Sequence, residues 1–237
     1  MTDGGARAAE LLQQDRVLLG RTSTAERVAA ILRQRITEGV FEPGARLSEE
    51  SIGAALGVSR NTLREAFRLL SHERLLVHEL NRGVFVRRLT ADDVADLYRL
   101  RRLIECAAIR QGLALSGEQG VTPSGEVLAA LRDAVHGAER AAAELRWEDV
   151  GTANMLFHQA IVELAGSSRL DEMMRQVLAE LRLSFLAMSN PRAFHEPYLG
   201  RNRDILKLIE AGDAPGAERL LGDYLSDAER QLAQAHS

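Results

Sequence analysis

The segment between residues 48 and 72 constrains the fold more than any other part of this 237-residue chain. Ser48 can cap a short helix over residues 49–56, and Gly57 ends it. Ser59 can then cap a second helix. A short glycine turn lets two helices cross steeply, so the second one protrudes. The apolar positions of that second helix are spaced for one buried face: Leu63, Ala66, Phe67 and Leu70.

The flanking segments predict a further helix and a hairpin. A helix is expected from Thr24, where apolar residues begin to recur with helical spacing, and Gly39 ends it. Ser23 or Thr24 can cap this helix. Residues 41–44 are expected to form a turn. Extended runs over residues 75–78 and 84–87 flank a polar tip. The order helix, helix, tight turn, helix, two-stranded hairpin predicts a winged helix-turn-helix.

Beyond residue 90 the pattern is helical throughout. Six helices are expected, over residues 91–114, 127–145, 147–164, 170–188, 197–211 and 214–235, with Ser189-Asn190-Pro191 as a firm stop. Such a series predicts an antiparallel bundle. The fold class is therefore mainly α. The predicted divisions are a flexible N-terminal arm (1–20), a winged helix-turn-helix domain (21–88) and a helical effector-binding and dimerisation domain (89–237).

Composition agrees with a soluble helical protein. With 46% hydrophobic and 27% charged residues, the chain can bury a core, which excludes wholesale disorder. No apolar run reaches the roughly 18 residues that span a bilayer. The N-terminus lacks the pattern of a secretory signal. A single cysteine, Cys106, excludes an internal disulfide and a multi-cysteine zinc site. We therefore expect a cytoplasmic protein with no membrane partner.

Charge is divided unevenly along the chain, whose formal net charge is −4. Residues 1–88 hold 14 arginines and 11 acidic residues, a net charge of +3. The remaining residues hold 16 basic and 23 acidic residues, a net charge of −7. The N-terminal part can therefore meet phosphates, although so small an excess also arises by chance.

The exposed face of the second helix in the pair carries candidate DNA-reading residues. Arg60 and Arg64 are four residues apart and project side by side. Arginine pairs with guanine through two hydrogen bonds, and asparagine, here Asn61, suits adenine. The hydroxyls of Ser59 and Thr62 can reach phosphates. The alternative is an ordinary solvated arginine-rich face, but the order of elements favours DNA binding.

Three further residues extend the predicted DNA interface. Arg82 lies at the hairpin tip, where the negative potential of a minor groove attracts arginine. Gly83 beside it serves the turn or approaches the DNA. Arg46, just before the short helix, contacts a phosphate or is simply exposed.

Several stretches resemble the GntR family of bacterial transcription regulators. They are GVFEPGARLSE at 39–49, LGVSRNTLREA at 56–66 and NRGVFV at 81–86. The C-terminal part is similar to the helical FCD domain of the FadR-like branch, through Leu100-Arg101 with Glu105, Asn154 with Phe157-His158, and Ala211-Gly212-Asp213 with Ala217. The resemblance covers residues 24–235. It implies a dimeric regulator, here a repressor, that binds a palindromic operator. The implied recognition residues are Ser59, Arg60, Asn61, Thr62, Arg64 and Gly83.

The resemblance also implies a small-molecule effector in the helical domain. Many FCD domains hold a divalent metal through an aspartate or asparagine, a histidine four residues later and two more histidines. Asn154 and His158 match the first two positions, and they are the candidate metal ligands. Asn202 and Tyr224 stand where the other histidines would be. One histidine, two amides and a phenol are a poor set for zinc or nickel, so no cofactor is assigned.

The same four positions suit an organic ligand. Arg101 lies on an apolar stripe, where a buried guanidinium needs an anionic partner. That partner is Glu105, a ligand carboxylate, or both. Arg182 is a further effector-binding candidate, or else a surface residue. These residues predict a pocket for a small organic acid.

Three other functions are alternatives to this one. An enzyme is excluded, because no strand-turn-helix nucleophile motif surrounds any serine. A helical domain that only dimerises, or a metal-dependent ligand sensor, remains open. In the regulator, residues 87–91 form the linker that is expected to transmit an effector-induced change to the DNA-binding domain.

Overall fold

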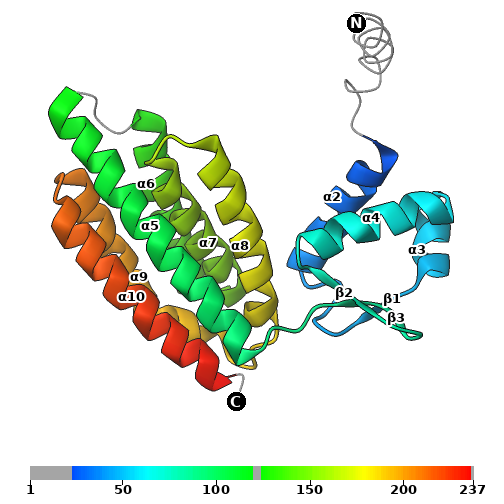
Figure 1. Ribbon diagram of the computed structural model, residues 1–237. Helices are drawn as coiled ribbons and strands as arrows, with labels where there is room; N and C mark the ends of the chain where they lie inside the picture. Colours follow the sequence, from blue (N-terminus) through cyan, green and yellow to red (C-terminus); the bar gives the residue numbers. More distant parts are fainter. Residues whose placement is uncertain (1–22, 120–123, 236–237) are drawn as a thin grey trace, which may run out of the picture. The chain divides into compact units, whose positions relative to one another are not determined.

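The computed structural model describes residues 23–119 and 124–235, in two compact units divided between Val86 and Arg87 (Figure 1). The predicted arm, residues 1–20, lies outside the described residues. The domain boundary expected after residue 88 falls just beyond this division. Within the described ranges, no helix is long and apolar enough to cross a membrane.

Three helices build the N-terminal unit: α2 (Thr24–Thr37), α3 (Glu49–Leu56) and α4 (Arg60–His72). Ser23 caps α2 in a reciprocal capping box with Glu26, which decides between the two caps that the sequence allowed. Gly57 has φ of 64°, the left-handed conformation that ends α3 and lets the chain turn into α4. Helices α2 and α4 pack together through their apolar stripes, with Leu63, Phe67 and Leu70 fully buried.

A small antiparallel sheet completes this unit. Its strands are β1 (Arg46–Leu47), β2 (Leu76–Glu79) and β3 (Gly83–Val86), in the order β1-β3-β2. The predicted hairpin is confirmed, with Val77 opposite Phe85. Strand β1 adds to the two-stranded wing that was expected. It forms because the Gly44 amide donates to the Val86 carbonyl (2.8 Å), and the Val86 amide donates to the Ala45 carbonyl (2.9 Å).

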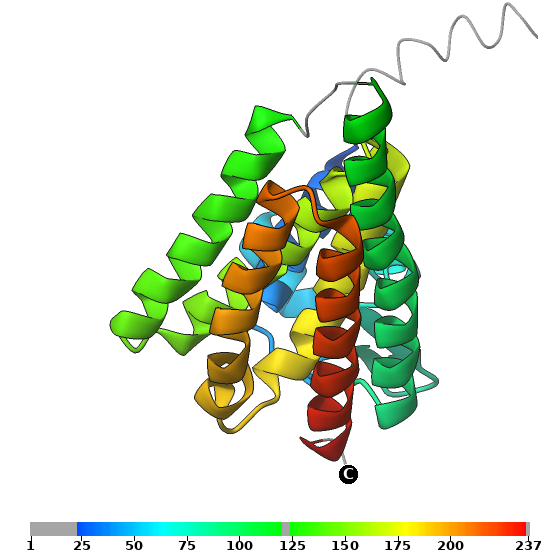
Figure 2. The same ribbon diagram turned by 90° about the vertical axis from the view of Figure 1, so that its left-hand side faces the viewer.

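The C-terminal unit is a bundle of long helices, which run side by side in Figure 2. Together with the N-terminal winged helix-turn-helix, it confirms the predicted mainly α fold class. Helices α5 and α10 pack together, as do α6 and α7. The described helices are α5 (Ala91–Gln119), α6 (Gly125–Ala143), α7 (Trp147–Glu163), α8 (Ser168–Leu186), α9 (Pro191–Glu210) and α10 (Ala214–Ala235).

Helix α9 corrects one prediction, because it begins at Pro191 and not near Pro197. Asn190 caps it by accepting a hydrogen bond from the Ala193 amide (3.1 Å), and proline suits the first helical position. Pro197 has no amide to donate to the carbonyl of Ala193 one turn earlier. The Gln231 side chain of α10 donates to that carbonyl instead (3.0 Å). A tertiary contact therefore satisfies the group that Pro197 leaves open.

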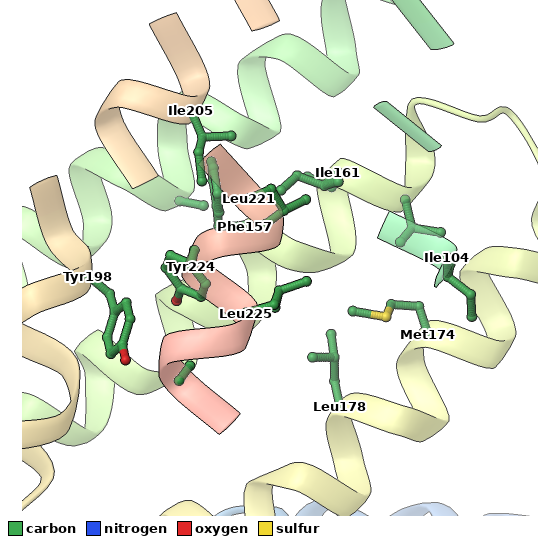
Figure 3. Close-up of a cluster of buried hydrophobic side chains, with 14 of the residues drawn as sticks. Ile104, Phe157, Ile161, Met174, Leu178, Tyr198, Ile205, Leu221, Tyr224 and Leu225 are labelled. Atoms are coloured by element: carbon green, nitrogen blue, oxygen red, sulfur yellow. The ribbon is translucent and has the colours of Figure 1, made fainter. Parts of the chain in front are cut away.

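The core of the bundle lies between α5, α6, α7, α8, α9 and α10. Figure 3 shows apolar side chains converging there, including Phe157 and Ile161 of α7 and Leu221 and Leu225 of α10. Each of these four side chains is fully buried. Burial of a side chain of this kind contributes about 1.5–3 kcal/mol. This apolar frame surrounds Tyr224, whose hydroxyl introduces polarity into the core.

Candidate DNA interface and effector site

Helix α4 presents its polar face to solvent from its first turn. Ser59 Oγ caps the helix by accepting a hydrogen bond from the Thr62 amide (3.1 Å), and it lies 2.9 Å from Thr62 Oγ1. Arg60 and Asn61 follow and are exposed. The first-turn amides and the positive end of the helix dipole attract phosphate here. The α4 residues predicted to contact DNA thus share one helix end and its exposed face.

Arg64 is joined to the neighbouring helix. Its Nε donates to both carboxylate oxygens of Glu49 on α3, at 3.2 and 3.0 Å. The Arg64 side chain is 63% exposed, so the pair is a surface ion pair that contributes about 0–1 kcal/mol. Arg64 can therefore exchange Glu49 for a guanine or a phosphate at small cost.

The wing brings Arg46 and Gly83 together. Gly83 has φ of 112°, and a Cβ on it would lie 3.3 Å from the Nε of Arg46. Glycine therefore allows the Arg46 side chain to lie against β3. Both residues border a hollow of about 360 Å³ that Glu49 and His78 also line. Arg82 is exposed near the tip, where it pairs with Glu79 and lies 5.5 Å from the centre of the Phe85 ring.

A buried charged triad occupies the helical unit. Arg101 Nε donates to Glu105 Oε1 (2.7 Å), one turn further along α5. The other carboxylate oxygen of Glu105 lies 2.6 Å from Nδ1 of His158 on α7. All three residues are 2% exposed or less. Of the partners expected for Arg101, which were Glu105, a ligand carboxylate or both, the structure supplies Glu105.

The surroundings fix the charges of this triad. Burial alone would raise the pKa of Glu105, but Arg101 and His158 outweigh it and hold that pKa below its usual value. Burial and Arg101 lower the pKa of His158, and Glu105 only partly opposes them. Burial also disfavours the charged form of Arg101, but Glu105 raises its pKa above the usual value. Glu105 is therefore ionised and His158 is neutral near pH 7.

Three more predicted effector residues, Asn154, Asn202 and Tyr224, form the other half of the cluster. Asn154 Oδ1 of α7 accepts hydrogen bonds from Asn202 Nδ2 of α9 (2.7 Å) and from the Tyr224 hydroxyl of α10 (2.9 Å). The Tyr224 ring packs edge-on against the His158 ring, with 5.0 Å between centroids. The structure thus gathers Arg101, Asn154, His158, Asn202 and Tyr224 from four helices. We call these five residues with Glu105 the polar cluster.

The polar cluster does not fit a zinc or nickel ion. Asn154 Oδ1 already accepts two hydrogen bonds, and Nδ1 of His158 is engaged by Glu105. One imidazole nitrogen, Nε2 of His158, is left, whereas these metals favour several imidazole or thiolate ligands. Among the described residues, no group of three or more histidine, cysteine, aspartate or glutamate side chains could hold a metal ion.

Arg182 occupies a neighbouring position on α8. A Cβ on Gly151 of α7 would lie 3.1 Å from Arg182 Nη1 and 2.8 Å from Nε2 of His195 on α9. Gly151 lies one helical turn before Asn154, so Arg182 and His195 lie beside the polar cluster along α7. Arg182 and His195 are 9% and 3% exposed. Arg182 is therefore buried, which corrects the alternative of a surface residue. Burial and Arg182 lower the pKa of His195 to about 4.

Sequence reasoning missed His195 and the contact between Glu105 and His158. Glu105 was visible only as the residue four positions after Arg101, because its second partner is 53 residues away. His195 falls in a segment that was expected to precede α9, where no buried face was expected. The start of α9 at Pro191 places it on the inward side of a helix.

Comparison with known proteins covers both units. Residues 24–86 match the sequence profile described as bacterial regulatory proteins, gntR family, and residues 96–227 match that of the FCD domain. The crystal structure of a GntR transcriptional regulator from Rhodococcus sp. RHA1 is 47% identical in sequence, with a TM-score of 0.81. That similarity covers 91% of this chain and 100% of the other.

Curated relatives agree with this assignment. The gluconate operon transcriptional repressor of Bacillus subtilis is 31% identical over 180 residues, which are 76% of this chain and 70% of that protein. The repressor RspR of Escherichia coli is 25% identical over 90% of this chain and 91% of its own length. The regulator YdhC of Bacillus subtilis is 29% identical, and its match spans 62% of each chain.

The relatives are named as transcriptional regulators, and none of those above is named as an enzyme. The family and these relatives are transcriptional regulators, as the prediction of a regulator instead of an enzyme requires. The two profiles together match most of the sequence, one in each structural unit. The chain therefore belongs to the gntR family of bacterial regulatory proteins and carries an FCD domain.

Proposed function

We propose that this protein represses transcription by binding a palindromic operator as a homodimer, and that a small organic acid in its helical unit changes its affinity for DNA. The observation that carries the DNA-binding half is the exposed face of α4. Arg60, Asn61 and Arg64 project from a capped helix end in a fold that the family uses for regulation. Such a protein acts in the cytoplasm, where the chromosome lies.

The α4 face suits sequence-specific recognition. Arg60 and Arg64 each offer the two parallel donors that recognise guanine, and Asn61 offers the donor and acceptor that recognise adenine. Ser59, Thr62 and Arg46 position the helix through phosphates. Two copies of α4 in a dimer read half-sites about one helical turn apart, roughly 34 Å.

The polar cluster supports the effector half of the proposal. A buried ionic and polar group is costly unless each member has a partner, and a ligand is one such partner. The cluster offers a guanidinium, an imidazole and an amide for direct contact, without a metal. The Bacillus subtilis relative is named for a gluconate operon, and gluconate is an organic acid.

The linker is anchored within the helical unit. Arg87 pairs with Glu180 of α8 (3.0 Å) and with Asp93 at the start of α5 (2.5 Å). Helix α5 also carries Arg101 and Glu105 of the polar cluster. A shift of α5 upon effector binding would therefore reach Arg87 directly. An effector that binds one arrangement better increases its population.

Selection of binding sites from a random DNA pool, followed by fluorescence-anisotropy titration, tests the DNA-binding half. We expect a palindromic consensus and a protein dimer on it. Arg60→Ala should lose about 1–3 kcal/mol of binding free energy and relax preference at one base position. Arg175→Ala on α8, which removes a surface arginine from the other unit, is the matched control. An unchanged consensus and affinity for Arg60→Ala would remove this residue from the readout.

A ligand screen tests the effector half against the two open alternatives. Chelator-treated protein on its operator is titrated with organic acids, and separately with zinc and nickel. A change in operator affinity caused by an acid without metal supports the proposal. A change that requires a metal favours the metal-dependent sensor. A bundle that dimerises but responds to no acid and no metal favours dimerisation alone.

A further inference from the structure

Three polar atoms of the polar cluster are buried and have no hydrogen-bond partner in the described structure. They are Nη2 of Arg101, Nε2 of His158 and Oδ1 of Asn202. They come from three helices, α5, α7 and α9, whose side chains meet around Asn154 and Tyr224. An unsatisfied buried polar atom costs about 1–3 kcal/mol. Three in one cluster indicate a site whose partners arrive from outside the chain.

The hydrogen bonds already present define what each atom offers. Arg101 Nη2 is a cationic donor. The ionised Glu105 accepts a hydrogen bond from Nδ1–H of the neutral His158 ring, so Nε2 carries a lone pair and is an acceptor. Asn202 uses its Nδ2 as donor to Asn154, which leaves Oδ1 as a second acceptor. The cluster therefore offers one positive donor and two neutral acceptors.

From this pattern we infer that the effector is a hydroxy acid, bound directly by the chain through its carboxylate at Arg101 and through hydroxyl groups at His158 Nε2 and Asn202 Oδ1. This inference rests on the proposed effector function and narrows its ligand class. A carboxylate without hydroxyls leaves both acceptors unpaired. An amino acid would bury an ammonium group, and Glu105 is already neutralised by Arg101.

The test compares ligands that share one carbon skeleton. Glycerate has a carboxylate and two hydroxyls, lactate has one hydroxyl, propanoate has none, alanine has an amine, and glycerol has no carboxylate. Gluconate and hexanoate form a longer matched pair. Isothermal titration calorimetry on chelator-treated full-length protein measures each affinity. Each satisfied acceptor should improve affinity about tenfold, since an unpaired buried group is relieved.

Two variants test the atoms themselves. Asn202→Leu removes the acceptor and should reduce the preference for a hydroxy acid over its hydroxyl-free match about tenfold. Gln159→Met on α7 is the control, because Gln159 Oε1 is also buried and unpartnered but its amide nitrogen bonds Glu163 and the Asp171 carbonyl. It should leave the preference unchanged. Circular dichroism checks folding, and if Asn202→Leu does not fold, the ligand series on the natural protein decides.

A hydroxy acid of either length that binds at least tenfold more tightly than its hydroxyl-free match supports the inference. If both propanoate and hexanoate bind within tenfold of their hydroxylated matches, the inference is overturned and the organic-acid effector is left standing. Tightest binding by alanine also overturns it, in favour of an amino-acid effector. Binding of none of these ligands, with operator binding intact, overturns both the inference and the effector half of the proposed function, but not DNA binding.

Discussion

Replacing Glu105 with glutamine tests the energetics of the buried triad. The substitution keeps the shape of the side chain and removes the charge that faces Arg101 at 2.7 Å. Both side chains are 2% exposed or less, so water cannot replace the lost partner. Breaking a buried ion pair in this way costs about 3–5 kcal/mol, because it leaves an uncompensated buried charge. At roughly 2–4 °C per kcal/mol, the melting temperature of the helical unit should fall by roughly 10 °C.

Urea denaturation followed by circular dichroism measures this loss of stability. Glu196→Gln on α9 is the control, because Glu196 forms a solvent-exposed ion pair with Arg192. The free energy of unfolding of this variant should hardly differ from that of the natural protein. Adding Arg101→Met to Glu105→Gln removes both charges and should recover most of the loss. The reasoning is refuted if Glu105→Gln is no more destabilising than Glu196→Gln, or if the double variant is less stable than the single one.

Four further substitutions probe other parts of the structure. His195 is neutral and buried, with its pKa lowered from 6.5 to about 4, so the unfolded chain binds its proton first as the pH falls. As the pH falls from about 6.5 to 4, the free energy of unfolding should therefore decrease by about 3 kcal/mol more in the natural protein than in His195→Gln. Equal pH profiles of the two proteins would contradict this. Gly151→Ala should destabilise by about 1–3 kcal/mol in thermal unfolding, because its Cβ would lie 2.8 Å from His195 Nε2. Gly200 is an exposed position of α9 where a Cβ would meet nothing within 4 Å, so Gly200→Ala should stabilise by about 0.5–1 kcal/mol. Ser59→Ala removes the cap of α4 and should lower the stability of the N-terminal unit by about 1 kcal/mol in urea, with an unchanged midpoint as the contrary result.

The local signals of the N-terminal unit predicted most of its structure. Ser48, Gly57 and Ser59 act through hydrogen bonds and dihedral angles within one helical turn, so the sequence places α3 and α4 correctly. Strand β1 was not predictable in this way. It exists because Gly44 and Ala45 bond to Val86, a residue that is distant along the chain.

The helical unit shows the same limit at α9. Pro191 was interpreted as part of a signal that ends a helix, yet proline also occurs at the first position of helices. Helix α9 can begin at Pro191 because the Ala193 carbonyl, which Pro197 leaves without a backbone donor, accepts a hydrogen bond from Gln231 on α10. The error in this boundary also hid His195 from the candidate residues.

The sequence by itself determined the fold class, the capped recognition helix and the polar residues that interrupt apolar stripes in the bundle. These follow from interactions over a few residues and from the 3.6-residue period of the helix. Only the tertiary structure decided how the polar residues pair. It joined Glu105 to His158, Asn154 to Asn202 and Tyr224, and Arg182 to the position of Gly151. Such partners lie on different helices, and their meeting depends on how the helices pack, which no local pattern along the chain encodes.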